Sequence, residues 1–165
     1  MNVYTFYRET MGVDSFRRAM ERVFLDRWKE SWSRYGWNPI VLGMKDIVKD
    51  DLYEEYKHTV LKFPTVNDIH YELSCYIRWF SLLSVEEELI VFSNYDVYNY
   101  GFESSSISGL GTGKAYEYDL CVLNNDSLLE FIDIILEAKH DYEKYLTLID
   151  GKQHMSDVYL SLIHI

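Results

Sequence analysis

Polar side chains directly follow a short apolar run in the middle of the chain. Residues 89–92 read Leu-Ile-Val-Phe, and Ser93, Asn94, Tyr95 and Asp96 come next. An unbroken run of β-formers is typical of a strand buried on both faces. Ligands of open α/β sheets bind beyond the carboxyl ends of such strands. Because Asp96 offers a carboxylate and Asn94 an amide oxygen, the spacing predicts a site for a hard cation such as Mg²⁺ or Mn²⁺. The alternative is a plain polar turn.

Three more ionisable side chains could join such a site. Arg78 lies in an otherwise apolar stretch, where a guanidinium needs an anionic partner. In a purely structural interpretation, that partner is Glu72 or another nearby acid. In a functional interpretation, Arg78 instead braces the 94–96 turn or contacts a phosphate. His154 and Asp157 stand together before a final apolar helix or strand. They can equally form an ordinary helix N-terminus.

The first part of the chain predicts the elements that would position these groups. Strands are expected at residues 3–7 and 39–42. Between them lies a helix with apolar residues at a period of 3.6 residues, which Asp14 or Ser15 can cap. Strand, helix and strand in this order indicate a βαβ unit and hence a parallel sheet.

The second part continues the pattern. A buried helix is predicted over 68–84. The stretch 103–114 is rich in serine and glycine, but it fits neither the Walker nor the dinucleotide-binding pattern. It is predicted to be a surface loop or a lid. Alternating apolar residues predict one half-buried strand over 116–122. A long helix is predicted over 127–149, opened by a capping box of Ser127 and Glu130.

Length and charge limit the class of protein. The 165 residues predict one α/β domain, 1–165, with a mostly parallel central sheet flanked by helices. The chain has 16 basic and 27 acidic residues and a net charge of −11. This balance disfavours a nucleic-acid partner, which requires a basic surface. A nucleotide is still compatible, since a metal ion and a few local cations can hold its phosphates.

Several features favour a cytoplasmic protein. No signal-peptide pattern follows Met1, and no apolar run approaches the roughly 18 residues of a membrane span. Cys75 and Cys121 are far apart and form no CxxC pair, which indicates neither a zinc site nor a disulfide framework. An aromatic content of 16% leaves room for a homodimer.

Residues 78–97 resemble the core of the DXD-containing glycosyltransferases with the fold-A nucleotide-sugar-binding domain. In that family an arginine-bearing helix leads into a strand that ends in Asp-x-Asp-Val. This chain has Asn-Tyr-Asp-Val at 94–97, and Glu-Glu at 86–87 where the family has Gly-Gly. Residues 28–42 are similar to the family's helix and second strand, and 154–157 to a late polar motif. The resemblance covers most of the chain, and its central motif is the specific part.

The resemblance implies a Rossmann-like domain that moves a sugar from a nucleotide-sugar donor to an unknown acceptor with Mn²⁺ or Mg²⁺. Asp96 would be the chief metal ligand, with Asn94 and His154 completing the coordination. Asp157 would act as the base or orient the acceptor. The donor would be bound by the end of the first strand, where the base and ribose lie, and by the central motif: Thr5, Phe6, Tyr7, Arg78, Asn94, Tyr95 and Asp96.

The alternative is a catalytically degenerate protein that binds a nucleotide sugar or another small molecule, or a protein-interaction module. Asn94 replaces the family's first aspartate, and 165 residues are few for the family. The acidic surface would also suit a basic protein partner. Detectable hydrolysis or transfer would distinguish the enzyme from this alternative.

Overall fold

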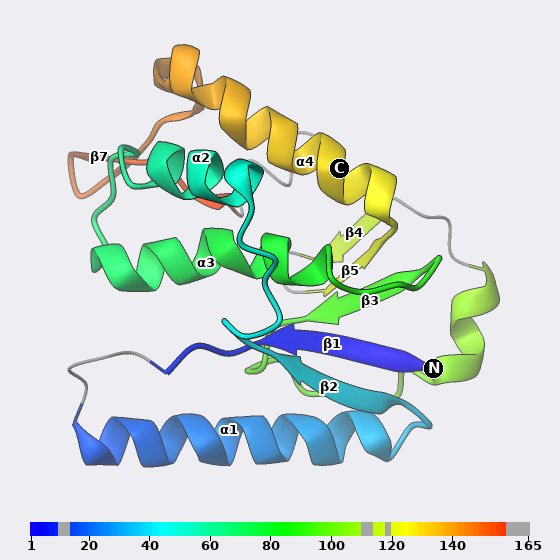
Figure 1. The fold of residues 1–165 in the computed structure, drawn as a ribbon. Helices are drawn as coiled ribbons and strands as arrows, with labels where there is room; N and C mark the ends of the chain where they lie inside the picture. Colours follow the sequence, from blue (N-terminus) through cyan, green and yellow to red (C-terminus); the bar gives the residue numbers. More distant parts are fainter. Residues whose placement is uncertain (10–13, 110–113, 118–119, 158–165) are drawn as a thin grey trace.

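The computed structural model describes residues 1–9, 14–109, 114–117 and 120–157, with the backbone alone at 108, 109 and 114–117. It has three layers. Helix α1 covers one face of a central sheet, and α2, α3 and α4 cover the other (Figure 1). None of the helices in this described part is both long and apolar enough to cross a membrane.

The central sheet has five strands in the order β2-β1-β3-β5-β4. The strands are β1 (Asn2–Phe6), β2 (Asn38–Leu42), β3 (Ile90–Ser93), β4 (Lys114–Glu117) and β5 (Leu120–Leu123). The pairs β1–β2 and β1–β3 are parallel, whereas β3–β5 and β4–β5 are antiparallel. The α/β class is therefore confirmed, and the expectation of a mostly parallel sheet is wrong.

The hairpin of β4 and β5 explains this correction. The sequence pattern predicted one strand over 116–122, but the chain reverses between β4 and β5. Neighbouring strands joined by so short a connection can pair only antiparallel, because a parallel pair needs a crossover of a dozen or more residues. With β5 also antiparallel to β3, this half of the sheet is antiparallel and the sheet as a whole is mixed.

Helix α1 (Ser15–Ser33) joins β1 to β2, as the βαβ pattern predicted. The Asp14 side chain caps it by accepting a hydrogen bond of 2.8 Å from the backbone N–H of Arg17. Its buried tryptophans, Trp28 and Trp32, pack in one cluster with sheet residues that share a face, among them Val3, Val91 and Val122. Ile107 of the 3₁₀ helix η1 (Ser104–Gly109), in the stretch predicted as a loop or lid, joins the same cluster.

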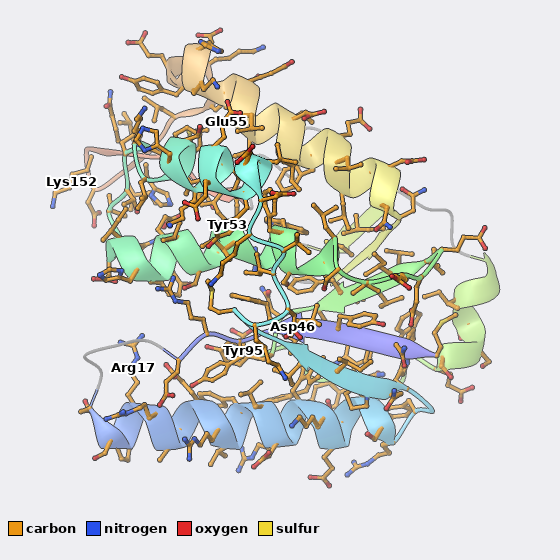
Figure 2. All side chains as sticks on the ribbon, viewed as in Figure 1. Arg17, Asp46, Tyr53, Glu55, Tyr95 and Lys152 are labelled. Carbon is orange, nitrogen blue, oxygen red and sulfur yellow. The ribbon has the colours of Figure 1, made fainter. Side chains whose placement is uncertain are left out.

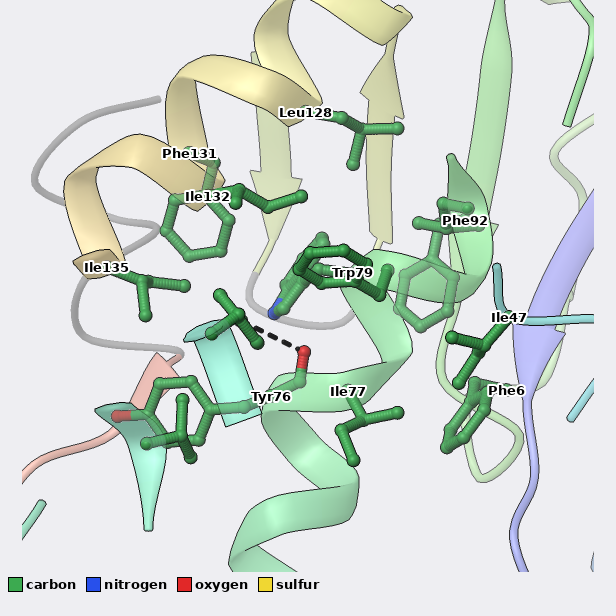
Figure 3. Packing of buried hydrophobic residues seen from close by; sticks show 14 of the residues in the cluster. Phe6, Ile47, Tyr76, Ile77, Trp79, Phe92, Leu128, Phe131, Ile132 and Ile135 are labelled. Atoms are coloured by element: carbon green, nitrogen blue, oxygen red, sulfur yellow. Dashed lines mark hydrogen bonds between the residues drawn. The ribbon is translucent and has the colours of Figure 1, made fainter. Parts of the chain in front are cut away.

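The opposite face of the sheet carries the larger core. It is covered by α2 (Asp51–Val60), α3 (Ile69–Leu82) and α4 (Asn125–Glu137). Glu55 of α2 accepts a 2.8 Å hydrogen bond from Lys139, just beyond α4 (Figure 2). At the centre, the ring of Trp79 lies 5.7 Å from Phe92 and 5.0 Å from Phe131, measured between centroids (Figure 3). This packing fixes α3 over the central strand.

The end of α4 differs from the prediction. The helix stops at Glu137 and not at Ile149, because residues 139–144 are all exposed and continue no apolar stripe. Two short 3₁₀ turns follow, η2 (Ala138–His140) and η3 (Tyr142–Tyr145), and then a hairpin of β6 (Thr147–Ile149) and β7 (Lys152–His154). The capping box is also different: Asn124 is the N-cap and Ser127 its partner.

The β6–β7 turn shows why the helix prediction ran too far. Asp150 and Gly151 have φ angles of 53° and 72°. Positive φ at both central residues is typical of the tight hairpin turn that Asp-Gly favours. The pair was interpreted as a helix stop, although it is equally a hairpin signal. The apolar helix or strand expected after Asp157 lies outside the described residues.

Candidate active site

The carboxyl ends of β1 and β3 meet at one edge of the sheet. The two strands are parallel, with Tyr4 opposite Phe92, so Tyr7 and Tyr95 come together with ring centroids 5.9 Å apart in an edge-to-face arrangement. Figure 2 shows Tyr95 between the sheet and α1, with Arg17 near the beginning of α1. A pocket of about 130 Å³ opens here. It includes six predicted donor-binding residues, namely Phe6, Tyr7, Arg78, Asn94, Tyr95 and Asp96.

Thr5, the seventh of these residues, does not line the pocket. Side chains alternate between the two faces of a strand, so Thr5 points to the α1 face with Val3, whereas Phe6 belongs to the core under α3. Thr5 is fully buried, and its hydroxyl oxygen has no hydrogen-bond partner among the described residues.

Arg78 forms a buried ion pair with Asp157. Its Nε and Nη2 donate to Asp157 Oδ2 at 3.1 and 2.7 Å, and the indole N–H of Trp79 donates to the same oxygen at 2.9 Å. Arg78 is 8% exposed and Asp157 is 1% exposed. Burial is the largest single effect and opposes the charge on Arg78, but the charge of Asp157, the hydrogen bonds to it and the neighbouring Cys75 and Cys121 together outweigh burial and raise the pKa of the guanidinium. The partner of Arg78 is thus Asp157 and not Glu72.

Arg78 also reaches the strand-end turn. Its Nη1 donates a 2.6 Å hydrogen bond to Asn94 Oδ1. The guanidinium therefore links three segments: helix α3, the turn after β3 and the residues after β7. This contact holds Asn94 in place beside Asp96, whose own carboxylate is exposed and makes no hydrogen bond or ion pair with the described residues.

His154 is placed elsewhere. It is buried on β7, and its Nδ1 accepts a long hydrogen bond of 3.4 Å from the backbone N–H of Val66. It does not line the pocket that contains Asn94 and Asp96. Within the described ranges there is no group of three or more His, Cys, Asp or Glu side chains with metal-binding geometry. The structure therefore brings Asn94 and Asp96 together, but does not bring His154 to them.

Six pocket residues were not predicted as site residues: Arg8, Arg17, Glu21, Tyr71, Ser74 and Cys75. Glu21 is buried and accepts a 2.9 Å hydrogen bond from the hydroxyl of Tyr7. It stands on the buried stripe of α1 with Leu25 and Trp28, and a carboxylate on such a stripe is a signal that sequence reasoning could have used. Arg8 is the second residue after β1, and its Nη1 is buried without a hydrogen-bond partner among the described residues.

Two pocket groups hold their protons firmly. Burial and the hydrogen bond to Glu21 raise the pKa of Tyr7 to about 12. Burial, together with the negative charge of Asp157, raises the pKa of Cys75 to about 12. Both therefore carry their protons at neutral pH, and Cys75 is an unreactive thiol. Tyr7 is left as a hydrogen-bond donor that fixes the Glu21 carboxylate.

Stability should fall as the pH rises from about 10 to about 12. An unfolded tyrosine loses its proton near pH 10, whereas Tyr7 and Tyr4 keep theirs in the folded state until about pH 12. The unfolded state then binds fewer protons, so the free energy of unfolding decreases through this window. Urea unfolding at several pH values would measure the slope. Tyr7→Phe should make it shallower, and equal slopes for variant and wild type would contradict the assignment.

The pocket can accommodate an anion beside an exposed carboxylate. Arg8, Arg17 and Arg78 surround it, and an unpartnered guanidinium nitrogen is suited to a phosphate oxygen. Asp96 supplies a carboxylate suited to a hard cation. Comparisons of the chain with models of known protein families, with curated proteins and with solved structures found no match. The chemistry of the pocket therefore follows from its own residues.

Proposed function

We propose that the protein is a metal-assisted glycosyltransferase with a Rossmann-like, fold-A nucleotide-sugar-binding domain, which moves a sugar from a nucleotide-sugar donor to an acceptor. The observation that carries this proposal is the meeting of Tyr7, Arg78 and Asp96 in one pocket at the carboxyl ends of two parallel strands. Ligands of α/β sheets bind at such positions. The residues come from distant parts of the chain, and the resemblance assigns all three to the donor.

Cationic side chains would hold the donor diphosphate. Arg8 and Arg17 line the pocket, and the buried, unpartnered Nη1 of Arg8 would gain a partner in a phosphate oxygen. Arg78 is already neutralised by Asp157, so in this proposal it mainly positions the 94–96 turn. The diphosphate is the part of the donor whose charge these groups match.

Asp96 would hold Mn²⁺ or Mg²⁺. Such ions are commonly bound by one or two carboxylates together with substrate phosphates and water, and the exposed carboxylate of Asp96 fits that role. Asn94 Oδ1 lies beside Asp96 and accepts a hydrogen bond from Arg78, and this proposal does not require His154. When bound, the ion would stabilise the charge that develops on the diphosphate leaving group.

Glu21 is the pocket carboxylate that we assign to the acceptor. Asp157 Oδ2 already accepts from Arg78 and Trp79 in a buried pair, which suits a positioning role better than that of a base. Glu21 is held by Tyr7 and lines the same pocket as Asp96. It would orient the acceptor hydroxyl and accept its proton.

The size of the pocket indicates which part of the donor it would take. About 130 Å³ is well below the roughly 300–1,000 Å³ of sites that enclose a whole drug-sized ligand. The pocket would therefore hold the diphosphate and sugar. The nucleoside would extend over its rim, where Tyr7 and Tyr95 offer aromatic surface.

The second candidate function is donor binding without turnover. It is favoured by Asn94, which replaces an acid of the family motif and whose Oδ1 accepts from Arg78. The proposal also keeps the expectation of a cytoplasmic protein, which the two thiols Cys75 and Cys121 suit. A homodimer stays a prediction.

Turnover separates the two functions. The purified protein is incubated with nucleotide sugars and Mn²⁺, and the release of nucleoside diphosphate is followed by chromatography. The enzyme should release product, and Asp96→Asn should abolish the release. Binding without release would favour the second candidate. If the protein neither binds a nucleotide sugar nor releases product, both candidate functions are contradicted.

A further inference from the structure

A second pocket, of about 220 Å³, adjoins the pocket of the candidate active site. Arg8 lines both pockets, so they meet at the end of β1. Helix α2 contributes Tyr53 and Lys57 to the second pocket, one turn apart, and α3 contributes Leu73 and Ile77, also one turn apart. Figure 2 shows Tyr53 between these two helices. We call this cavity the second pocket.

The inner lining of the second pocket is apolar. Leu73, Ile77 and Tyr53 are buried members of the larger core, and Met44 packs against that core. The ring of Tyr53 is held by an edge-to-face contact with Phe80, with centroids 5.6 Å apart. The volume is below the roughly 300–1,000 Å³ of sites that enclose a drug-sized ligand. The second pocket therefore suits a small ligand with an apolar body.

The charged lining of the second pocket is mainly cationic. Arg8, Lys49 and Lys57 line it, and Glu54 is the only acid among the described residues that do. Lys57 pairs with Glu54 at 3.2 Å, whereas Arg8 and Lys49 form no ion pair with the described residues. Arg8 is half-buried, and its Nη1 has no hydrogen-bond partner among these residues. A guanidinium partly withdrawn from water without a counter-charge costs free energy, which an anionic ligand would offset.

The loop that carries Lys49 is fixed by two acids. Asp46 Oδ2 accepts a 2.8 Å hydrogen bond from the backbone N–H of Gly43, and Asp50 Oδ1 accepts one of 2.9 Å from the backbone N–H of Tyr53 as the N-cap of α2. Neither of these acids lines the second pocket. Their carboxylates hold the backbone in place, and Lys49 is presented to the second pocket from an ordered loop.

We propose that the second pocket binds a small hydroxy acid, and that this acid is the acceptor of the transferred sugar. Its carboxylate or phosphate would contact Arg8, Lys49 and Lys57, which are suited to either group. Its apolar body would lie against Leu73 and Ile77. A neutral ligand would leave Arg8 without a counter-charge, and an ion without an apolar body would leave the inner lining uncovered.

The position beside Arg8 suits an acceptor. Because Arg8 lines both pockets, an acid in the second pocket would lie next to the donor and to Glu21. The hydroxyl of the acid would form a bond to the anomeric carbon of the sugar while the bond from that carbon to the diphosphate breaks. The bonding electrons would leave with the diphosphate, and Glu21 would take the hydroxyl proton. The role as acceptor rests on the proposed function, whereas the binding of an acid does not.

A titration without any donor tests the binding of an acid. Benzoate, phenyl phosphate and uncharged benzamide, which share an apolar ring, are added to the full isotope-labelled chain and followed by NMR. The tighter-binding acid identifies the head group, and it should bind about tenfold or more tightly than benzamide because it gains charge-assisted hydrogen bonds. The amide signals of Lys49, Tyr53 and Ile77 should shift. Equal affinity for the acids and benzamide, no binding, or shifts centred on Asp96 would overturn the proposal.

Matched variants locate the cations. Lys49→Gln and Lys57→Gln should each weaken the binding of the tighter acid about tenfold. Lys62→Gln makes the same change at an exposed lysine that does not line the second pocket, and its affinity should stay within about twofold of wild type. The melting temperatures of all three variants, measured by circular dichroism, control for folding. If Lys49→Gln and Lys57→Gln both bind the acid as wild type does, the second pocket does not hold it.

A second titration tests whether the acid is the acceptor. The tighter acid is titrated again in the presence of Mn²⁺ and a saturating UDP-, GDP- or CMP-sugar. An acceptor binds together with its donor, so the affinity for the acid should stay within about threefold or increase. Loss of acid binding would mean that donor and acid compete for one site, and would overturn the role as acceptor. If no nucleotide sugar binds, that role falls with the proposed function, while acid binding is still decided by the first titration.

Discussion

Replacing Asp157 with asparagine should lower the free energy of unfolding by about 3–5 kcal/mol, because it leaves the charge of Arg78 uncompensated in the interior. Asp157 Oδ2 accepts two hydrogen bonds from Arg78 and one from Trp79, and the Arg78 and Asp157 side chains are 9% and 2% exposed. For a domain of this size the melting temperature should fall by about 10 °C. Urea unfolding followed by circular dichroism measures the change directly.

A control and a double variant make this result decisive. Asp133→Asn removes a carboxylate from the exposed face of α4 and should change stability by less than about 0.5 kcal/mol. Arg78→Met combined with Asp157→Asn removes the buried charge altogether, so the pair should lose less stability than Asp157→Asn alone. The double variant also keeps the test available if the single variant fails to fold. A loss below about 1 kcal/mol for Asp157→Asn would mean that the ion pair does not hold the turn.

Asp96→Asn should lower the affinity for a nucleotide sugar in the presence of Mn²⁺ by about a hundredfold or more, while leaving stability almost unchanged. The exposed Asp96 carboxylate makes no hydrogen bond or ion pair with the described residues, so its loss costs the fold little. A hard cation, in contrast, loses its carboxylate ligand, and an amide oxygen does not replace the charge. Isothermal titration calorimetry with and without Mn²⁺ measures the difference.

Asp126→Asn is the matched control for Asp96→Asn. It makes the same chemical change at an exposed acid at the beginning of α4, which does not line the pocket. Its affinity and metal dependence should equal those of wild type. If Asp96→Asn also binds like wild type, the metal is held elsewhere or is not used.

The sequence predicted the parallel half of the sheet, in which one helix connects β1 to β2. The buried run before Asn94 became β3, and the helix capped by Asp14 became α1 between parallel β1 and β2. The direction of β4 and β5 was not predictable from alternation, because a period of two is the same in parallel and antiparallel strands. The end of α4 was missed because Asp150-Gly151 suits a helix stop and a hairpin turn equally well.

The parts of the candidate site that could be predicted are those whose residues lie close together in the sequence. Asn94 and Asp96 follow a recognisable strand, so their position at the sheet edge could be inferred. The partner of Arg78 could not be inferred from the sequence, because Asp157 lies 79 residues further along the chain. Thr5 was misplaced because a shift of one residue turns a strand side chain to the opposite face. Glu21 and Arg8 enter the pocket through the packing of α1 and the end of β1 on β3, which no local pattern encodes.

The most direct measurement is a thermal-shift panel of UDP-, GDP- and CMP-sugars, each with and without Mn²⁺, on the wild-type protein. A ligand that binds the folded state raises the melting temperature by mass action. The proposed function predicts a rise with the sugars of one nucleotide base, and only when sugar nucleotide and Mn²⁺ are both present. A flat panel, or a rise that is the same without the metal, would contradict it.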